Sequence, residues 1–224
     1  MARPTDTQRR LDLALRSVEV LERVGLGMPT EQLALAVGLK RPTFVYYFPT
    51  HGHVIEAALV ALFTEQAMAV LPAIEAHSHP IDRVFAQMRA VHAFHHGRES
   101  RVVFLTQAVA TIGGARGSEI VARGAAVFAA HRRAAAERVR EGISAGEVMP
   151  CDPDALVATM RALTDGLMVQ RVTDGLDLAA SHALIWKHLL LPLKRKPAGK
   201  TRAPKSRPAK ASKAPRSPAR RKRT

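Results

Sequence analysis

The segment Leu33–Phe48, LALAVGLKRPTFVYYF, constrains the fold of this 224-residue chain more than any other stretch. Its first half carries apolar side chains at helical spacing, namely Leu33, Ala34 and Val37. Gly38 then ends that helix, because a positive φ costs little only for glycine. Lys40 and Arg41 open a second helix, with Pro42 in its first turn, where a missing amide donor is tolerated. The pattern predicts two short helices joined by a tight turn.

The second of these helices has an inward and an outward side. Three aromatic side chains are predicted to pack inward: Phe44, Tyr47 and Phe48. The side chains left facing outward are Lys40, Arg41, Thr43, Val45 and Tyr46. Side chains of these types on the second helix of a helix-turn-helix can reach phosphates and base edges in the major groove of DNA.

At these residues the sequence resembles the TetR family of bacterial transcriptional regulators. The run VGLKRPTFVYYFPTHGHVIEAAL is similar to that family's recognition helix, its aromatic end and the start of a long connecting helix, and the resemblance covers residues 9–66. Three positions depart from the family pattern. Val45 replaces a tyrosine that touches the DNA backbone, His51 replaces a lysine, and Lys40 replaces a serine cap.

The resemblance implies an all-α protein. An N-terminal three-helix helix-turn-helix DNA-binding domain, residues 1–51, would be joined by a long helix to an all-helical ligand-binding and dimerisation domain, residues 52–193. The predicted DNA contacts are Lys40, Arg41, Thr43, Tyr46, Tyr47 and His51. Of these, Thr43 and Tyr46 are expected to contact bases or backbone through hydrogen bonds, and the two cations to contact phosphates.

The net charge of +15 is concentrated at the C-terminal end. Residues 194–224 hold seven Lys and seven Arg and no acid, which leaves 20 basic against 19 acidic side chains in residues 1–193. This tail also holds five prolines and no aromatic or large aliphatic side chain. It cannot bury enough apolar surface to offset the entropy of ordering, so we predict that it is disordered.

A cationic, proline-punctuated tail is expected to bind a polyanion, and double-stranded DNA is the partner that the helix-turn-helix already implies. Its composition is similar to that of linker-histone tails. Two alternatives are a tail that serves only solubility and one attracted to anionic lipid. No apolar anchor adjoins the charges, so no membrane partner is expected.

The periodicity of residues 1–193 predicts helices throughout. Beyond the helix-turn-helix, a first helix is expected from residue 11 to near Gly25 and Gly27. Further helices are expected over residues 52–71 (ended or kinked by Pro72), 81–96, 99–112 (stopped by Gly113 and Gly114), 119–144 and 177–191, with another that begins at Asp152 or Pro153.

The last two of these helices predict a homodimer. One carries a coiled-coil type seam and the other a broad apolar face, and the residues expected at the interface are Leu156, Met160, Leu163, Leu167, Ala183, Trp186 and Leu190. In the TetR family the equivalent pair forms a four-helix bundle with its two-fold mate. The alternative is an intramolecular core without a dimer. Two recognition helices could read half-sites about one DNA turn apart.

The central helices are the expected site of a small hydrophobic or amphipathic effector. The predicted pocket region contains thioethers, aromatics and isolated hydrogen-bonding groups: Met88, His92, Phe104, Gln107, Phe128, His131, Met160, Thr164 and Met168. For each one singly, plain core packing is the competing interpretation. A metal site built from His92, His95 and His96 is a further alternative, but no metal and no cofactor is predicted.

The residue inventory argues against catalysis. The sequence has no glycine-rich phosphate loop, nucleophile elbow or cysteine pair, and its isolated carboxylates are explained by helix capping. Its single cysteine, Cys151, excludes an internal disulfide and leaves redox sensing as a minor alternative. No signal peptide and no apolar run of about 20 residues is evident, so a cytoplasmic, nucleoid-associated location is expected.

These features together predict a sequence-specific DNA-binding regulator, a repressor relieved by a ligand and acting as a homodimer. Two other classes of protein compete with this interpretation. One is a nucleoid-type protein that coats DNA mainly through the basic tail, and the other is a ligand carrier with a vestigial helix-turn-helix.

Overall fold

The computed structural model describes residues 4–112 and 114–195, and these residues fold as an all-α protein. The helices are α1 (Pro4–Val24), α2 (Thr30–Ala36), α3 (Arg41–Tyr47), α4 (His51–Glu75), α5 (Pro80–His95), α6 (Glu99–Ile112), α7 (Gly114–Val127), α8 (Ala129–Ser144), α9 (Pro153–Asp174) and α10 (Leu178–Ile185), followed by a π-helical turn η1 (Trp186–Leu190) and a 3₁₀ turn η2 (Leu191–Leu193). The described part contains no strand beyond one isolated bridge. The predicted disorder of residues 196–224 and the predicted stop at Gly113 lie outside the described residues.

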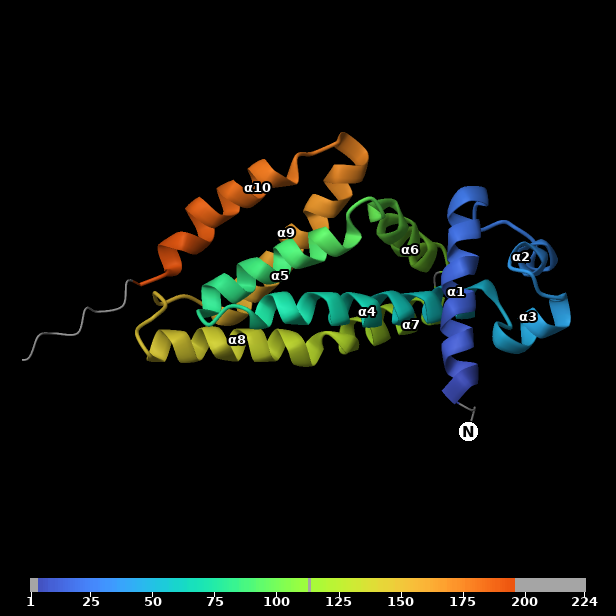
Figure 1. Cartoon of the computed structure of the whole chain (residues 1–224), viewed down its shortest axis with the longest axis horizontal. Coiled ribbons are helices and arrows are strands. Elements are labelled where there is room, and N and C mark those ends of the chain that lie inside the picture. Colours follow the sequence, from blue (N-terminus) through green and yellow to red (C-terminus); the bar gives the residue numbers. More distant parts are fainter. Residues whose placement is uncertain (1–3, 113, 196–224) are drawn as a thin grey trace, which may run out of the picture.

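Helices α1–α4 share one apolar core at one end of the molecule. Figure 1 shows α1 crossing the end of α4, with α2 and α3 on its outer side. Phe44 and Phe48 anchor α3 in that core, since neither ring is exposed to solvent. Gly38 has φ +77° between α2 and α3, as the predicted turn requires. The core continues through Leu105 of α6 and Ile120 of α7, so the N-terminal helices rest directly on the larger helical unit.

Helix α4 links the two ends of the molecule and is longer than expected. It continues through Pro72 to Glu75, whereas the sequence predicted an end or kink at that proline. Among the described helices, α4 alone is long and apolar enough to cross a membrane by length and composition. One side of α4 packs against α1 and α5, with Val54, Ile55 and Ala58 completely buried, whereas Val60 and Met68 are exposed.

The predicted long helix over residues 119–144 is two helices. Helix α7 begins at Gly114, and Phe128 separates it from α8. The Phe128 ring packs edge-on against Phe63 of α4, with 5.1 Å between the ring centroids. The chain therefore bends where an aromatic side chain docks on α4.

The C-terminal helices begin at the residues that the sequence suggested. Asp152 accepts hydrogen bonds from the backbone N–H groups of Asp154 and Ala155 at the start of α9, and Asp177 caps α10 in the same way. Gly175, at φ +67°, ends α9. Figure 1 shows α9 passing behind α5 and α10 running back in the opposite direction above it.

Part of the predicted dimer seam is already covered within the protomer. Four of its residues are buried inside the protomer: Leu156, Met160, Leu167 and Leu190. They pack in one cluster with Ile81, Val84 and Met88 of α5 and with Val139 of α8. Leu163 and Trp186 are half-buried against the same cluster, and only Ala183 is exposed.

The last described residues, Lys194 and Arg195, are held by contacts at the end of the molecule opposite α3 (Figure 1). The Lys194 ammonium lies 2.6 Å from one carboxylate oxygen of Asp82 and 5.4 Å from the centre of the Trp186 ring. The Arg195 backbone N–H donates to the carbonyl oxygen of Glu147 at 2.8 Å. Residues 194 and 195 therefore belong to the folded unit, whereas the sequence placed the start of the disordered tail at residue 194.

Candidate nucleic-acid interface and ligand cavities

Helix α3 presents a polar, cationic face to solvent. The exposed side chains are those of Lys40, Arg41, Thr43, Val45 and Tyr46. Tyr46 is 75% exposed although it is a large aromatic residue, whereas Phe44 and Phe48 on the opposite side are fully buried. This is the division into two faces that the sequence predicted. The helix has no acidic residue, so the face is positively charged.

Tyr47 occupies an intermediate position at the edge of this face. Its ring is half-buried, lies edge-on to Tyr46 at 5.3 Å and packs against the core of the N-terminal helices. Both sequence interpretations of Tyr47, inward packing and DNA contact, are compatible with that position.

Helix α1 adds two cations beside α3 that the sequence analysis missed. The Arg10 guanidinium lies over the Phe48 ring and donates to the carbonyl oxygen of Tyr47 at 3.4 Å. Arg9 is exposed, with its guanidinium 6.0 Å from the centre of the Tyr47 ring. The adjacent pair of arginines in the sequence was the available signal, but its proximity to α3 depends on the crossing of α1 over α4.

His51 is placed differently from the other predicted DNA contacts. It begins α4 and is half-buried, and its Nε2 atom is buried without a hydrogen-bond partner among the described residues. Burial lowers the pKa of the imidazole, so the neutral form is favoured. A neutral ring with a buried Nε2 is poorly suited to hold a phosphate through that atom, and a DNA contact by His51 stays a prediction.

The three histidines near the end of α5 face different partners. His92 is buried, with Nε2 2.9 Å from the carbonyl oxygen of Thr164 and Nδ1 2.7 Å from Nε2 of His182. His95 is buried with Nε2 2.8 Å from Oε1 of Gln66, whereas His96 is exposed. Within the part of the chain that the structure describes, no group of three or more His, Cys, Asp or Glu is arranged to hold a metal ion.

The predicted effector pocket does not form one site. Met88, Met160 and Thr164 are buried, and Met168 lies in a separate cluster with Val70 and Ile74. Phe104 packs against the N-terminal core, Phe128 packs on Phe63, and Gln107 is exposed. His131 is half-buried, and burial is the main cause that lowers its pKa. The prediction was wrong for Gln107, because α6 turns that side chain to solvent.

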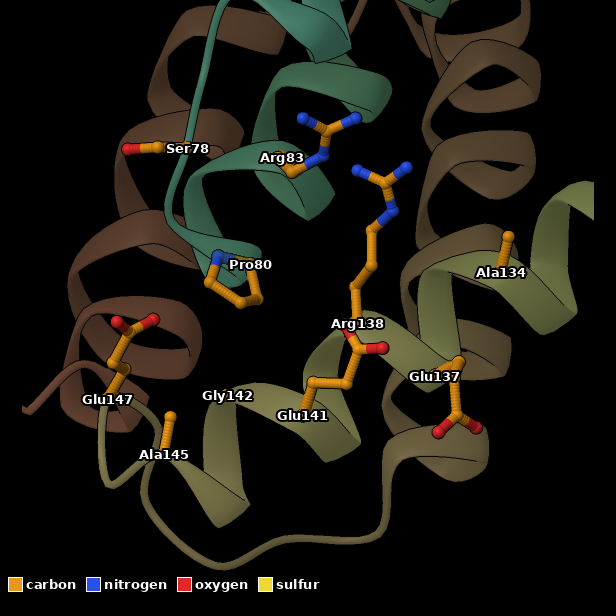
Figure 2. Close-up of a pocket in the computed structure, with 10 residues that line it drawn as sticks. All are labelled: Ser78, Pro80, Arg83, Ala134, Glu137, Arg138, Glu141, Gly142, Ala145 and Glu147. Carbon is orange, nitrogen blue, oxygen red and sulfur yellow. The ribbon is translucent and has the colours of Figure 1, made fainter.

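Neither of two cavities on the described surface is lined by a residue of the predicted pocket. The first has a volume of about 500 Å³ and lies between the start of α5 and the end of α8 (Figure 2). The second, of about 560 Å³, lies between α4, α5 and Trp186. It is lined by four alanines, two aromatic rings and three polar side chains: Ala73, Ala86, Ala90, Ala93, Phe85, Trp186, His77, Asp82 and Arg89.

Comparison with protein families and with curated proteins gives no match to this sequence. The structure is similar to several solved structures. A putative TetR-family transcriptional regulator from Rhodococcus sp. is 18% identical, with a TM-score of 0.63 over 80% of this chain and 95% of that chain. AibR in complex with isovaleryl coenzyme A and operator DNA is 17% identical, with a TM-score of 0.60 over 83% and 99%. The ketosteroid transcriptional regulator KstR2 of Mycobacterium tuberculosis is 16% identical, with a TM-score of 0.59 over 84% and 96%.

Proposed function

We propose that this chain, which has the fold of TetR-family transcriptional regulators, is a sequence-specific DNA-binding regulator that acts as a homodimer and releases DNA when a small ligand binds. The observation that carries the proposal is the exposed side of α3. A helix held by two buried phenylalanines presents two cations, a hydroxyl and a 75% exposed tyrosine to solvent. An exposed tyrosine beside two cations does not contribute to the apolar core, so folding alone does not account for this surface. Its hydrogen-bonding groups and positive charge are suited to a DNA groove.

Each exposed residue of α3 has a distinct role in this proposal. Lys40 and Arg41 contact phosphates, and Arg9 of α1 extends the same positive surface. Thr43 and Tyr46 contribute hydrogen bonds to base edges or backbone. The half-buried Tyr47 shapes the edge of the interface.

A second copy of the chain is proposed to cover the outward faces of α9 and α10. These faces and the turns η1 and η2 that follow α10 expose large apolar side chains, namely Val169, Val172, Leu184, Leu189 and Leu191. Leu184 is 63% exposed. Neighbouring small residues such as Ala158, Ala162 and Ala180 are exposed as well and would allow close helix packing. A dimer of this kind places two α3 helices on one duplex.

The effector is proposed to be apolar or amphipathic and to enter the cavity beside Trp186. The alanine-lined floor gives an apolar surface, and the exposed Arg89 could orient a polar end of the ligand. Two of the similar structures carry names that refer to isovaleryl coenzyme A and to ketosteroids. Helix α4 lines this cavity at Ala73 and reaches the N-terminal core, so a ligand that prefers one position of α4 would change DNA affinity.

The basic segment is proposed to add affinity for DNA without sequence preference. Residues 196–224 hold six Lys and six Arg and no acid. Counterion release would make this contribution strongly dependent on salt. A cytoplasmic, nucleoid-associated location follows from the proposed partner.

The decisive experiment is selection of bound sequences from a random DNA pool by the full-length protein at about 150 mM salt. We expect an enriched motif with two half-sites and a preference for it of about a thousandfold or more over random duplex. The variant K40E/R41E should lose this binding. The control variant R98E/R133E changes charge equally at exposed positions outside α3 and outside the proposed dimer surface, and it should bind normally.

Two outcomes of this experiment would reject the proposal. Strong binding with no preferred sequence would identify a DNA-coating protein that acts through the basic segment. Absence of any selected DNA would favour a ligand carrier with a vestigial helix-turn-helix.

The effector is tested separately through Trp186, the single tryptophan of the chain. Titration with fatty acids, acyl-coenzyme A esters and steroids should change its emission, since the ring lines the cavity. The variant A90F should suppress the change by filling the cavity, whereas A110F at an exposed position of α6 should not. A response that is equal in A90F and in the unmodified protein would place the ligand elsewhere.

A further inference from the structure

The cavity between α5 and α8 has an unusual distribution of charge. It is lined by Ser78, Pro80, Arg83, Ala134, Glu137, Arg138, Glu141, Gly142, Ala145 and Glu147. Figure 2 shows Arg83 from α5 and Arg138 from α8 extending toward the same end of the cavity, with their guanidinium groups side by side. The carboxylates of Glu137 and Glu147 lie away from that end (Figure 2).

No carboxylate of the described residues forms an ion pair with either of these arginines. Arg138 forms neither a hydrogen bond nor an ion pair within the described part of the chain, and Arg83 donates to the carbonyl oxygen of His77 at 2.8 Å. Glu137 is instead paired with Arg140 on the outer side of α8. The two guanidinium groups therefore lie near each other without an ion-paired carboxylate among the described residues.

The two positive charges act on each other and on a neighbouring histidine. Burial and then the positive charge of Arg138 lower the pKa of Arg83, against a smaller opposing effect of Glu75. His131 lies two turns before Arg138 on α8, and burial followed by the charges of Arg138 and Arg83 lowers its pKa. Like charges in contact destabilise a folded protein unless an opposite charge joins them. A bound anion would supply that charge.

We propose that Arg83 and Arg138 form an oxyanion site, which binds the phosphate or carboxylate group of a small molecule in this cavity. Guanidinium groups match both anions through pairs of parallel N–H donors. The volume of about 500 Å³ is within the range of small-molecule sites. Glu141 and Glu147 would face the uncharged or cationic part of the ligand. The site shares no residue with α3 or with the cavity beside Trp186, so it stands independently of the proposed DNA binding.

The test compares the full-length protein with R138Q and with R133Q, which removes an exposed arginine from the same helix outside the cavity. Thermal unfolding and calorimetric binding are measured with inorganic pyrophosphate and with acetate, at ionic strength matched by sodium chloride. All three proteins keep the basic segment, so any anion binding by that segment is common to them.

The expected result has two parts. R138Q should have a higher melting temperature than the unmodified protein without added anion, because the repulsion is removed. It should also bind the anion about 10-fold to 100-fold more weakly, as expected for the loss of a charged hydrogen-bond donor. R133Q should match the unmodified protein in both measurements. Saturable binding of pyrophosphate alone would assign the site to phosphate, and saturable binding of acetate alone would assign it to carboxylate.

Equal affinities for the anion in all three proteins would overturn the proposal, because the binding would then belong to other cations. Absence of saturable binding of either anion would overturn it as well. A lower melting temperature for R138Q with unchanged anion binding would show that Arg138 has a purely structural role.

Discussion

His92 of α5 and His182 of α10 are joined ring to ring, with His92 Nδ1 2.7 Å from His182 Nε2 and the ring planes only 6° apart. The Nε2 atom of His92 lies 2.9 Å from the carbonyl oxygen of Thr164 and must donate to it. His92 Nδ1 therefore accepts, and His182 Nε2 donates. One buried side chain thus ties α5 to α9 and α10, and burial lowers the pKa of both imidazoles.

Replacing His182 should separate the hydrogen bond from simple packing. H182L leaves the buried Nδ1 of His92 without a donor, and we expect the free energy of unfolding to fall by about 1–3 kcal/mol. H182Q retains an amide donor and should be less destabilised. Urea unfolding at pH 7.5 and fixed protein concentration measures both, with H188L at an exposed position as the control. Equal destabilisation of H182L and H182Q would contradict the assigned hydrogen bond.

Acid should destabilise the protein through His95. Burial, followed by the charge of Arg98, lowers the pKa of His95 from 6.5 to about 4, against the opposing charge of Glu99. Between these pH values the unfolded chain binds more protons than the folded one, so stability is lost as the pH falls through this window. The contribution of His95 reaches about 3 kcal/mol at most.

The variant H95Q tests this pH dependence. The decrease in unfolding free energy between pH 7.5 and 4.5 should be smaller in H95Q than in the unmodified protein. H188Q, at an exposed position, should keep the original pH dependence. Identical pH profiles for H95Q and the unmodified protein would show that His95 does not cause the acid sensitivity.

The outward faces of α9 and α10 should hold the homodimer together. The variant V169E/L184E places two carboxylates on this apolar surface, and we expect it to sediment as a monomer because burying an unpaired charge is costly. V60E introduces a carboxylate at an exposed position of α4 and should remain a dimer. Sedimentation equilibrium distinguishes the two states. A dimer that persists in V169E/L184E would place the interface elsewhere.

Removal of residues 196–224 should weaken binding to all DNA sequences together. The cut belongs after Arg195, since Lys194 is paired with Asp82 and Arg195 is bonded to Glu147 in the folded unit. The slope of log affinity against log salt should flatten by up to about 0.9 for each phosphate that the shortened protein no longer neutralises. Fluorescence anisotropy over a series of salt concentrations measures this slope. Equal slopes with and without the segment would show that it does not bind DNA.

The local pattern of the sequence predicted the helix-turn-helix in detail. Gly38 marked the turn, Phe44 and Phe48 marked the buried side of α3, and Tyr46 marked its exposed side. Helical periodicity reports which side of a short helix is apolar, and a helix with one apolar side has one way to pack. The sequence likewise predicted the helix starts at Asp152 and Asp177, because helix capping depends on residues close in sequence.

The choice of interface residues on the C-terminal helices differs from the structure for a physical reason, because several of them are already buried within the protomer. Leu156, Met160 and Leu167 form an apolar seam, but a seam does not identify the surface that covers it. In the fold α5 packs on these residues. The faces of α9 and α10 that carry Val169 and Leu184 are less apolar and are exposed to solvent. Both faces are apolar enough to be buried, so the sequence alone could not rank them.

The sequence by itself determined the all-α class, the positions of most helices and the two faces of α3, since each depends on interactions between residues a few positions apart. Only the tertiary structure decided which apolar faces are internal, that His92 meets His182, and that Arg83 meets Arg138. These pairs are separated by tens of residues along the chain, and their proximity depends on how α5, α8 and α10 pack. Periodicity carries no information about such long-range neighbours, because it describes one helix at a time.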